Sequence, residues 1–154
     1  MTLIPVFNMV NVARTLESFA DNQERKTFAA FIYAGESFTN RARERGTYTD
    51  RTANLRNSIG YAIAKNGKVV KFSCPDRAYE TEDGRNSGGP ESKDAAMKTA
   101  KEVAAKYRRG MVLIGFAGME YAAAVESRGY DVISGYMPET ETDLKNALED
   151  AGLR

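Results

Sequence analysis

The chain has 154 residues, 42% of them hydrophobic and 28% charged, as expected for one soluble globular domain with room for a core. It contains a single Cys, Cys74, and no His, which excludes an intramolecular disulfide, a multi-cysteine metal site and catalysis by a Ser–His or Cys–His pair. No apolar run reaches the roughly 20 residues of a membrane span, and the N-terminus has no basic leader, which argues against a signal peptide.

The net charge of +1 hides an asymmetry along the chain. Residues 1–71 carry 11 basic and 6 acidic residues, whereas residues 72–154 carry 11 basic and 15 acidic residues. The contrast is greatest between NRARERG (40–46), which is basic, and PETETDLKNALEDAG (138–152), which is acidic. Two interpretations are open: a solvated surface with uneven ends, or a dipolar subunit whose basic face meets the acidic face of a neighbour.

The first long element is predicted to be a helix over roughly residues 11–44. Its apolar face, at helical spacing, consists of Leu16, Phe19, Ala20, Phe28, Phe31, Ile32, Gly35, Phe38 and Ala42. The wholly polar segment DNQERK (21–26) leaves open a break or a change of face there. Gly46 is a natural stop, and the arginines before it suit the negative end of the helix dipole. A nucleic-acid patch is the alternative interpretation of these arginines.

The segment 48–74 has the strongest local pattern in the chain. Thr49 or Asp50 is placed to cap a short helix, and Asn66-Gly67 lies between two alternating runs, which predicts a two-residue hairpin. Counting outward from that turn predicts the pairs Lys65–Lys68, Ala64–Val69, Ile63–Val70, Tyr61–Phe72 and Ile59–Cys74. One face of the hairpin then carries Ile59, Tyr61, Ile63, Val70, Phe72 and Cys74 and is predicted to be core. The other face carries Gly60, Ala62, Ala64, Val69, Lys71 and Ser73, whose mostly small side chains allow close approach by a helix or another chain.

A long flexible loop is predicted at about 75–92, because this segment is rich in Pro, Gly and charge. Ordering of this loop against a partner is one interpretation. A metal site is the other, and it would use Asp76, Glu80, Glu82 and Asp83. These carboxylates lack the fixed positions of a calcium loop, which disfavours a metal.

The remaining elements complete an α+β domain. A helix is predicted from Ser92 or Asp94 to Gly110, and a buried strand over 110–118. A short helix or turn and a strand at 131–136 follow, and then a last helix that starts at Pro138. The fold class is therefore α+β, with a small antiparallel sheet packed against a long N-terminal helix and further helices in a single domain over 1–154.

Two motifs resemble the head–tail joining proteins of tailed bacteriophages, also called neck or tail-completion proteins. TDRTANLRNSI (49–59) is similar to the family's Asp-Thr-Gly-x-Leu-Arg-x-Ser-Ile signature, and GMEYAAAVESRGYDVI (118–133) to its Tyr-Ala…Val-Glu-x-Gly segment. The matching residues, which are candidates for the interface, are Asp50, Thr52, Leu55, Arg56, Ser58, Ile59, Tyr121, Ala122, Val125, Glu126 and Gly129. Arg51, Ala53 and the SRG segment before Tyr130 depart from the pattern.

The resemblance implies a structural protein of the virion without catalysis, cofactor or metal. Its members form rings between the head and the tail, so the expected partners are copies of the chain, as a hexamer or dodecamer with the hexamer favoured. Portal or head-completion proteins and tail-tube or tail-terminator proteins are the expected neighbours, with no membrane and no sequence-specific nucleic acid. The expected location is the virion neck, assembled in the bacterial cytoplasm. An ion pair between Arg56 and Glu126 is a further hypothesis.

Two other classes of function are weighed beside this one. A small nucleic-acid-binding protein would use the Arg41–Arg56 cluster together with aromatic residues: Arg41, Arg43, Arg45, Arg51, Arg56, Tyr48 and Tyr61. The near-neutral net charge disfavours strong phosphate binding. An enzyme would depend on Tyr, Lys or an oxygen-bound metal at the 76–83 carboxylates, and no motif demands it.

Overall fold

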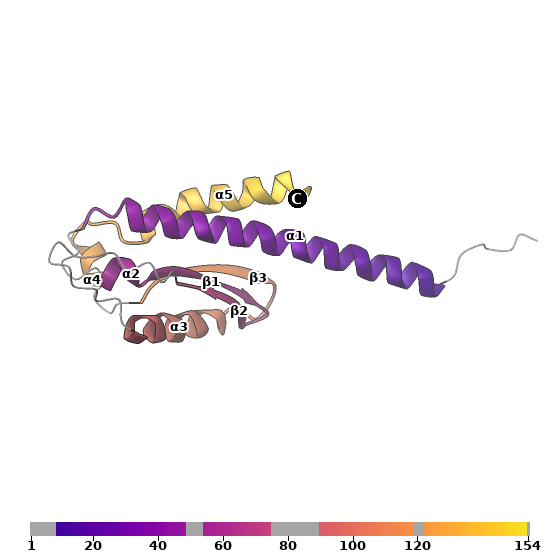
Figure 1. Cartoon of the computed structure of the whole chain (residues 1–154), viewed down its shortest axis with the longest axis horizontal. Helices are drawn as coiled ribbons and strands as arrows, with labels where there is room; N and C mark the ends of the chain where they lie inside the picture. Colours follow the sequence, from indigo (N-terminus) through magenta and orange to yellow (C-terminus); the bar gives the residue numbers. More distant parts are fainter. Residues whose placement is uncertain (1–8, 49–53, 75–89, 119–121, 154) are drawn as a thin grey trace, which may run out of the picture.

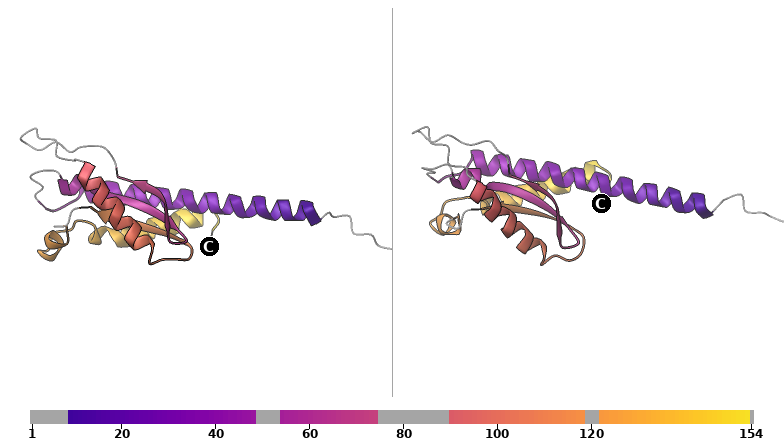
Figure 2. Two further views of the ribbon diagram at one scale, coloured as in Figure 1. Left: turned by 90° about the horizontal axis from the view of Figure 1, so that it is seen from below. Right: turned by 60° about the horizontal axis from the view of Figure 1, so that its bottom comes forward.

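The computed structural model describes residues 9–48, 54–74, 90–118 and 122–153. In chain order, the elements are α1 (Met9–Glu44), α2 (Asn54–Asn57), β1 (Ile59–Lys65), β2 (Lys68–Ser73), α3 (Pro90–Ala104), β3 (Met111–Ala117), α4 (Ala122–Ser127), a 3-10 turn η1 (Ser134–Tyr136) and α5 (Met137–Asp150). The antiparallel sheet has the order β2-β1-β3. Helix α1 covers one face with α5 beyond it, and α3 covers the other face (Figures 1 and 2). The predicted α+β class is confirmed.

Helix α1 is continuous through the polar segment 21–26, where a break was left open. Its C-terminal half packs on the sheet and on α5, but its N-terminal half runs on past both (Figure 1). Every described side chain from 9 to 22 is exposed. We call residues 9–22 the arm. The sequence pattern placed Leu16 and Phe19 on the apolar face of this helix, and both are exposed because no part of the described body reaches so far along the helix.

The central strand β1 separates two apolar cores. On the α1 side, its larger side chains Ile59, Tyr61 and Ile63 are fully buried. On the α3 side, its small side chains pack against Ala96, Ala100 and Ala104 of α3. Alanine faces on both elements let the helix lie close to the strand. Of the two uses left open for this small-sided face, packing within the chain is the one observed.

Asn66 and Gly67 form the two-residue turn of the β1–β2 hairpin. Their backbone φ angles are 52° and 84°, and a positive φ at both central residues is the mark of a type I′ turn, so the hairpin prediction is confirmed. The turn is also tied to the start of β3, because the Asn66 N–H donates to the Gly110 oxygen at 2.9 Å and the Gly110 N–H donates to Asn66 Oδ1 at 3.0 Å. The two pairs next to the turn are as predicted: Lys65–Lys68 and Ala64–Val69.

A β-bulge at Val70 makes the predicted register wrong farther from the turn. Ile63 lies opposite Lys71 rather than Val70, and Tyr61 lies opposite Ser73 rather than Phe72. The shift also removes the predicted pairing of Ile59 with Cys74. As a result Phe72 and Cys74 belong to the α3-side core and not to the α1 side. The bulge gives Phe72 a stacking partner in Phe116, with ring centroids 5.0 Å apart, and leaves Val70 51% exposed.

Two predicted boundaries and one predicted strand also need correction. Helix α3 ends at Ala104, six residues before Gly110, and begins at Pro90. The predicted strand at 131–136 is wrong, because this segment forms η1. Its backbone N–H groups at Ile133 and Ser134 donate to the Glu126 carboxylate, so they are not available to a strand partner. The strand over 110–118 and the last helix are confirmed. The predicted cap at Thr49 or Asp50 and most of the 75–92 loop lie outside the described residues.

Gly35 lets α1 lie against the sheet at Tyr61. A Cβ atom added at Gly35 would lie 2.3 Å from Cδ2 of the fully buried Tyr61 ring, and the Tyr61 hydroxyl donates to Glu36 Oε1 at 2.9 Å. We therefore expect Gly35→Ala to lower the free energy of unfolding by about 1–2 kcal/mol, because the clash outweighs the better helix propensity of Ala. Chemical denaturation measures the change. Ser18→Ala on the exposed arm is the control, and a more stable Gly35→Ala protein would contradict this account.

Candidate functional site

The first motif lies at the junction between α2 and β1. Leu55, Ser58 and Ile59 are buried, and the Ser58 hydroxyl donates to the Leu55 carbonyl oxygen at 2.7 Å. The Arg56 guanidinium lies over the Tyr48 ring, 5.8 Å from its centroid. These residues turn the chain from the short helix into the central strand. Asp50 and Thr52, the other residues of this motif, lie outside the described residues.

The second motif holds the segment between α4 and α5. The Glu126 carboxylate accepts hydrogen bonds from the N–H groups of Ile133 and Ser134 and from the Ser134 hydroxyl, each at 2.8 Å. Gly129 has a φ of 89°, the left-handed conformation that ends a helix, and its N–H donates to the backbone carbonyl oxygen of Glu126 at 2.9 Å. Tyr121 lies outside the described residues. Both motifs therefore contain local structural contacts.

The hypothesised ion pair between Arg56 and Glu126 is not formed. Among the described residues, the ion pairs do not include one between these two side chains, and Glu126 faces the backbone at 133–134 instead. Burial raises the pKa of Glu126, but the hydrogen bonds from Ile133 and Ser134 outweigh it and hold that pKa below its ordinary value of 4.5. The carboxylate thus acts as a cap for the loop.

Arg43 is a buried cation that joins α1 to the start of β1. Its side chain is in the core, with the residue only 3% exposed. Its Nη2 donates to the carbonyl oxygens of Asn57 and Ile59 at 3.0 and 2.9 Å, and Nε donates to Ile59 at 3.1 Å. A guanidinium presents several donors in a rigid plane and can hold two neighbouring carbonyl groups, here those on either side of Ser58, in this way. Arg43 is therefore not available to a phosphate.

The basic segment 40–46 and the acidic segment 138–152 meet each other within the chain. Arg41 Nη1 lies 2.6 Å from Asp143 Oδ2, and its Nε lies 3.3 Å from Glu139 Oε2. Arg45 Nη1 lies 3.4 Å from the same Glu139 oxygen. The charge asymmetry of the sequence is thus used to hold α5 against α1, and it gives no support to a contact between oppositely charged subunits. With Arg43 buried, the nucleic-acid interpretation of this cluster also loses its support.

Half of the ten large hydrophobic side chains that are exposed in the described part of the chain lie on the arm. Five large side chains are exposed along it: Met9 (69%), Val10 (55%), Val12 (38%), Leu16 (64%) and Phe19 (62%). Four of them follow helical spacing at positions 9, 12, 16 and 19 and form a stripe on one side of the helix. The arm's three charged residues, Arg14, Glu17 and Asp21, fall outside this stripe. Farther along α1, Ala30 and Arg41 lie on this same side of the helix, and they face α5 rather than the sheet.

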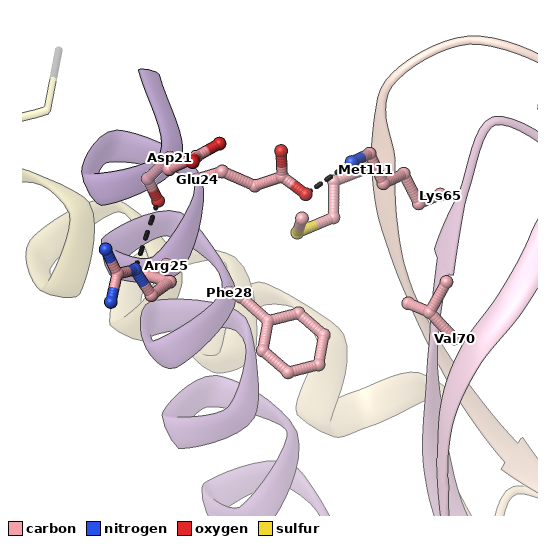
Figure 3. A pocket seen from close by; sticks show the side chains of 7 residues that line it. All are labelled: Asp21, Glu24, Arg25, Phe28, Lys65, Val70 and Met111. Carbon is pink, nitrogen blue, oxygen red and sulfur yellow. Dashed lines mark hydrogen bonds and ion pairs between the residues drawn. The ribbon is translucent and has the colours of Figure 1, made fainter. Parts of the chain in front are cut away.

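A pocket of about 510 Å³ lies where the arm joins the body (Figure 3). Phe28, Val70 and Met111 form its apolar part. Glu24 reaches from α1 toward the hairpin and pairs with Lys65, and this ion pair closes one side of the pocket. Val70 lines this pocket because of the β-bulge, and the sequence pattern did not predict that bulge.

A second pocket, an apolar groove of about 540 Å³, runs beside the outer edge of β3. Its walls come from β3 and from the first turns of α5, and Met111, Leu113, Met137 and Leu144 are among the apolar residues that line it. The strand β3 lies at one edge of the sheet, and its seven residues MVLIGFA include no charged side chain. The opposite edge, β2, carries Lys68, Lys71 and the bulge. Lysines and bulges protect an edge against further pairing, so only the β3 edge of this sheet lacks these devices.

No protein-family model, curated protein or solved structure matches the chain. Within the described residues, no three or more His, Cys, Asp or Glu side chains are grouped to hold a metal ion. The helices of this part of the chain also include none that is long and apolar enough to cross a membrane. The predicted metal alternative at the 76–83 carboxylates lies outside the described residues.

The Glu126 cap predicts a pH-dependent contribution to stability. A carboxylate whose pKa is lowered in the folded state stabilises the fold above its unfolded pKa, and this contribution is lost as the pH falls through the folded pKa. We expect Glu126→Gln to be less stable than wild type at pH 7. The difference should shrink as the pH falls below about 4.5, the ordinary value for this side chain. Urea denaturation at a series of pH values measures it, with Glu17→Gln on the exposed arm as the control. A difference that does not change with pH would contradict the role of the charged cap.

Proposed function

We propose that the protein is a non-enzymatic structural subunit that assembles with copies of itself into a ring at the neck of a tailed bacteriophage. In that place it would join the DNA-filled head to the tail. The observation that carries the proposal is the arm, a helix that extends past the body with an uncovered apolar stripe. The two motifs at 49–59 and 118–133 supply the link to the head–tail joining family.

The arm supports self-assembly because its exposed apolar side chains lie together on one side of a helix that no other described element covers. Single exposed apolar side chains are common, but contiguous apolar patches of several hundred Å² mark interaction sites. Covering the stripes of two copies would bury on the order of 1,000 Å² in total, the lower limit for a specific interface. A second contact between bodies would add to this area.

The composition of the arm favours a protein partner over a membrane surface. Helices that lie on membranes carry Lys and Arg on their polar face, which anionic lipids attract. Residues 9–22 contain one basic side chain, Arg14, against two acidic ones, Glu17 and Asp21. The arm therefore lacks the electrostatic attraction that such helices use.

A ring needs two different surfaces on each subunit, because a head-to-tail contact joins one patch to another. The arm is one such surface, and the groove beside β3 lies on the body of the same chain. Together they give a subunit the means to contact a neighbour on each side. Six copies are favoured over twelve by the family resemblance, with portal or head-completion proteins and tail-tube or tail-terminator proteins above and below.

Charged substitutions on the arm should weaken the assembly. We expect Leu16→Glu combined with Phe19→Glu to raise the dissociation constant at least about 100-fold, because burying two unpaired carboxylates in an apolar contact is costly. Sedimentation velocity over a concentration series measures the change. Tyr107→Glu, at a 51% exposed position on the body, is the matched control. Equal association of the arm variant and wild type would remove the arm from the interface.

The location in a virion can be tested by quantitative mass spectrometry of purified phage particles from the source culture. The proposal expects a low copy number, about one ring per particle relative to the major capsid protein. Imaging of those particles would then place the ring along the neck. Absence from mature particles despite abundance in infected cells would contradict the proposal.

A further inference from the structure

We propose that the hairpin end of the domain binds the phosphate backbone of double-stranded DNA without reading its sequence. We call this surface the basic end. It consists of the β1–β2 turn (65–68) and the segment 101–110, which covers the last turn of α3 and the chain that leads to β3. This inference goes beyond the proposed function and does not depend on ring assembly. Six basic side chains and one acidic side chain lie on the basic end: Lys65, Lys68, Lys101, Lys106, Arg108, Arg109 and Glu102.

The two segments of the basic end are fixed against each other. The Asn66 N–H donates to the Gly110 oxygen at 2.9 Å, and the Gly110 N–H donates to Asn66 Oδ1 at 3.0 Å. A Cβ atom added at Gly67 would lie 3.6 Å from the Cα atom of Arg108, so the turn rests on the chain that follows α3. Figure 1 shows this turn beside the C-terminal end of α3. The charged side chains therefore extend from a preformed backbone, which lowers the entropic cost of binding.

Five of the six cations have no acidic partner in the described part of the chain. Lys65 pairs with Glu24 of α1, but none of the ion pairs includes the other five. All five are exposed. Arg41 and Arg43 of α1, by contrast, have acceptors within the chain. The cations of the basic end are thus available to an anion from outside.

The needs of the fold account for only part of this charge. Protection of the β2 edge explains Lys68, and the dipole of α3 favours a cation in its last turn, where Lys101 lies. Neither reason applies to Lys106, Arg108 and Arg109, which lie between the end of α3 and the start of β3. Crowded like charges repel one another and cost the folded state free energy. A polyanion would relieve this repulsion.

The residue types favour DNA over an acidic protein. Lysine is depleted from interfaces between proteins, whereas interfaces with DNA are much more positively charged. Three of the five unpaired cations are lysines. Tyr107, 51% exposed, is the one large apolar side chain exposed on the described basic end, so the apolar centre typical of a protein interface is missing there.

The single aromatic side chain also favours a duplex over a single strand. Proteins that bind single strands use several aromatic side chains, on which successive bases stack. One exposed tyrosine does not supply such a row, but its hydroxyl can donate to a phosphate. Contacts with phosphates carry no sequence information, so we expect duplexes of different sequence to bind equally well.

The test measures the binding of the full chain to a fluorescein-labelled duplex by anisotropy, over a series of salt concentrations. The logarithm of the affinity should fall linearly with the logarithm of the salt concentration, by about 0.9 for each phosphate contact. Lys106→Gln combined with Arg108→Gln should make this slope shallower by about 2, because two contacts are lost. The same variant should raise the dissociation constant at least about tenfold at about 0.1 M salt.

Lys26→Gln combined with Arg128→Gln is the matched control. It also removes one exposed lysine and one exposed arginine, so the net charge changes equally, but both positions lie outside the basic end. The control should keep the slope and the affinity of the wild type. Equal losses in the two double variants would remove the basic end from the contact with DNA.

The remaining outcomes separate this inference from the proposed function. A wild-type chain that does not bind the duplex at about 0.05 M salt would overturn the inference and leave the structural subunit standing. Tighter binding to one strand of the same duplex would overturn the assignment to double-stranded DNA. Binding of polyglutamate without binding of DNA would overturn it in favour of an acidic protein partner.

Discussion

The burial of β1 on both of its faces is the constraint on which the rest of the structure depends. From Ile59 to Ala64 every residue of the strand is buried, and only Lys65 at the turn is not. The two faces differ in side-chain size, so they select different partners. The larger side chains meet α1 at Gly35, where the absence of a side chain makes room for Tyr61. The Gly and Ala face meets the alanines of α3, and the layer order follows from this difference.

Two arginines of α1 hold the start of β1 and the first turns of α5 in place. Arg43 enters the core and binds the carbonyl groups where β1 begins, which is possible because each donor of the guanidinium directed at Asn57 or Ile59 finds an acceptor. Arg41 holds the first turns of α5 through Glu139 and Asp143. The basic segment 40–46 and the acidic segment 138–152 therefore form ion pairs with each other within one chain. The stripe left uncovered on the arm is apolar, which turns the question of function from charge to hydrophobic contact.

The sequence predicted local features well and long-range ones less well. The Asn66-Gly67 turn, the small-sided face of the hairpin and the α+β class follow from patterns that span a few residues. The bulge at Val70 does not, because it goes with the stacking of Phe72 on Phe116, a residue 44 positions away in the chain. A strand pattern at 131–136 was overridden by the Glu126 carboxylate, which takes the backbone N–H groups that a strand would need.

The exposed arm and the contacts of the two motifs were also not predicted from local sequence patterns. Helical periodicity predicts apolar positions along α1 from Leu16 to Ala42, but it cannot say where the part of the helix that packs on the body ends. The polar segment 21–26 was the available signal, because it lies between the exposed arm and the part of α1 that packs on the body. The motif residues were predicted as interface candidates, whereas the described ones, such as Ser58 and Glu126, make contacts within the chain.

The continuity of α1 gives the exposed arm a physical advantage as a binding element. A helix of about 14 residues alone in water is only marginally stable, because forming its first turn is costly. Here that turn has already formed in the packed half of α1, between Ala30 and Arg43. The arm extends from a stable helix, so a partner that binds it does not need to supply the free energy of helix nucleation. A single helix can thus serve as core at one end and as a preformed contact surface at the other.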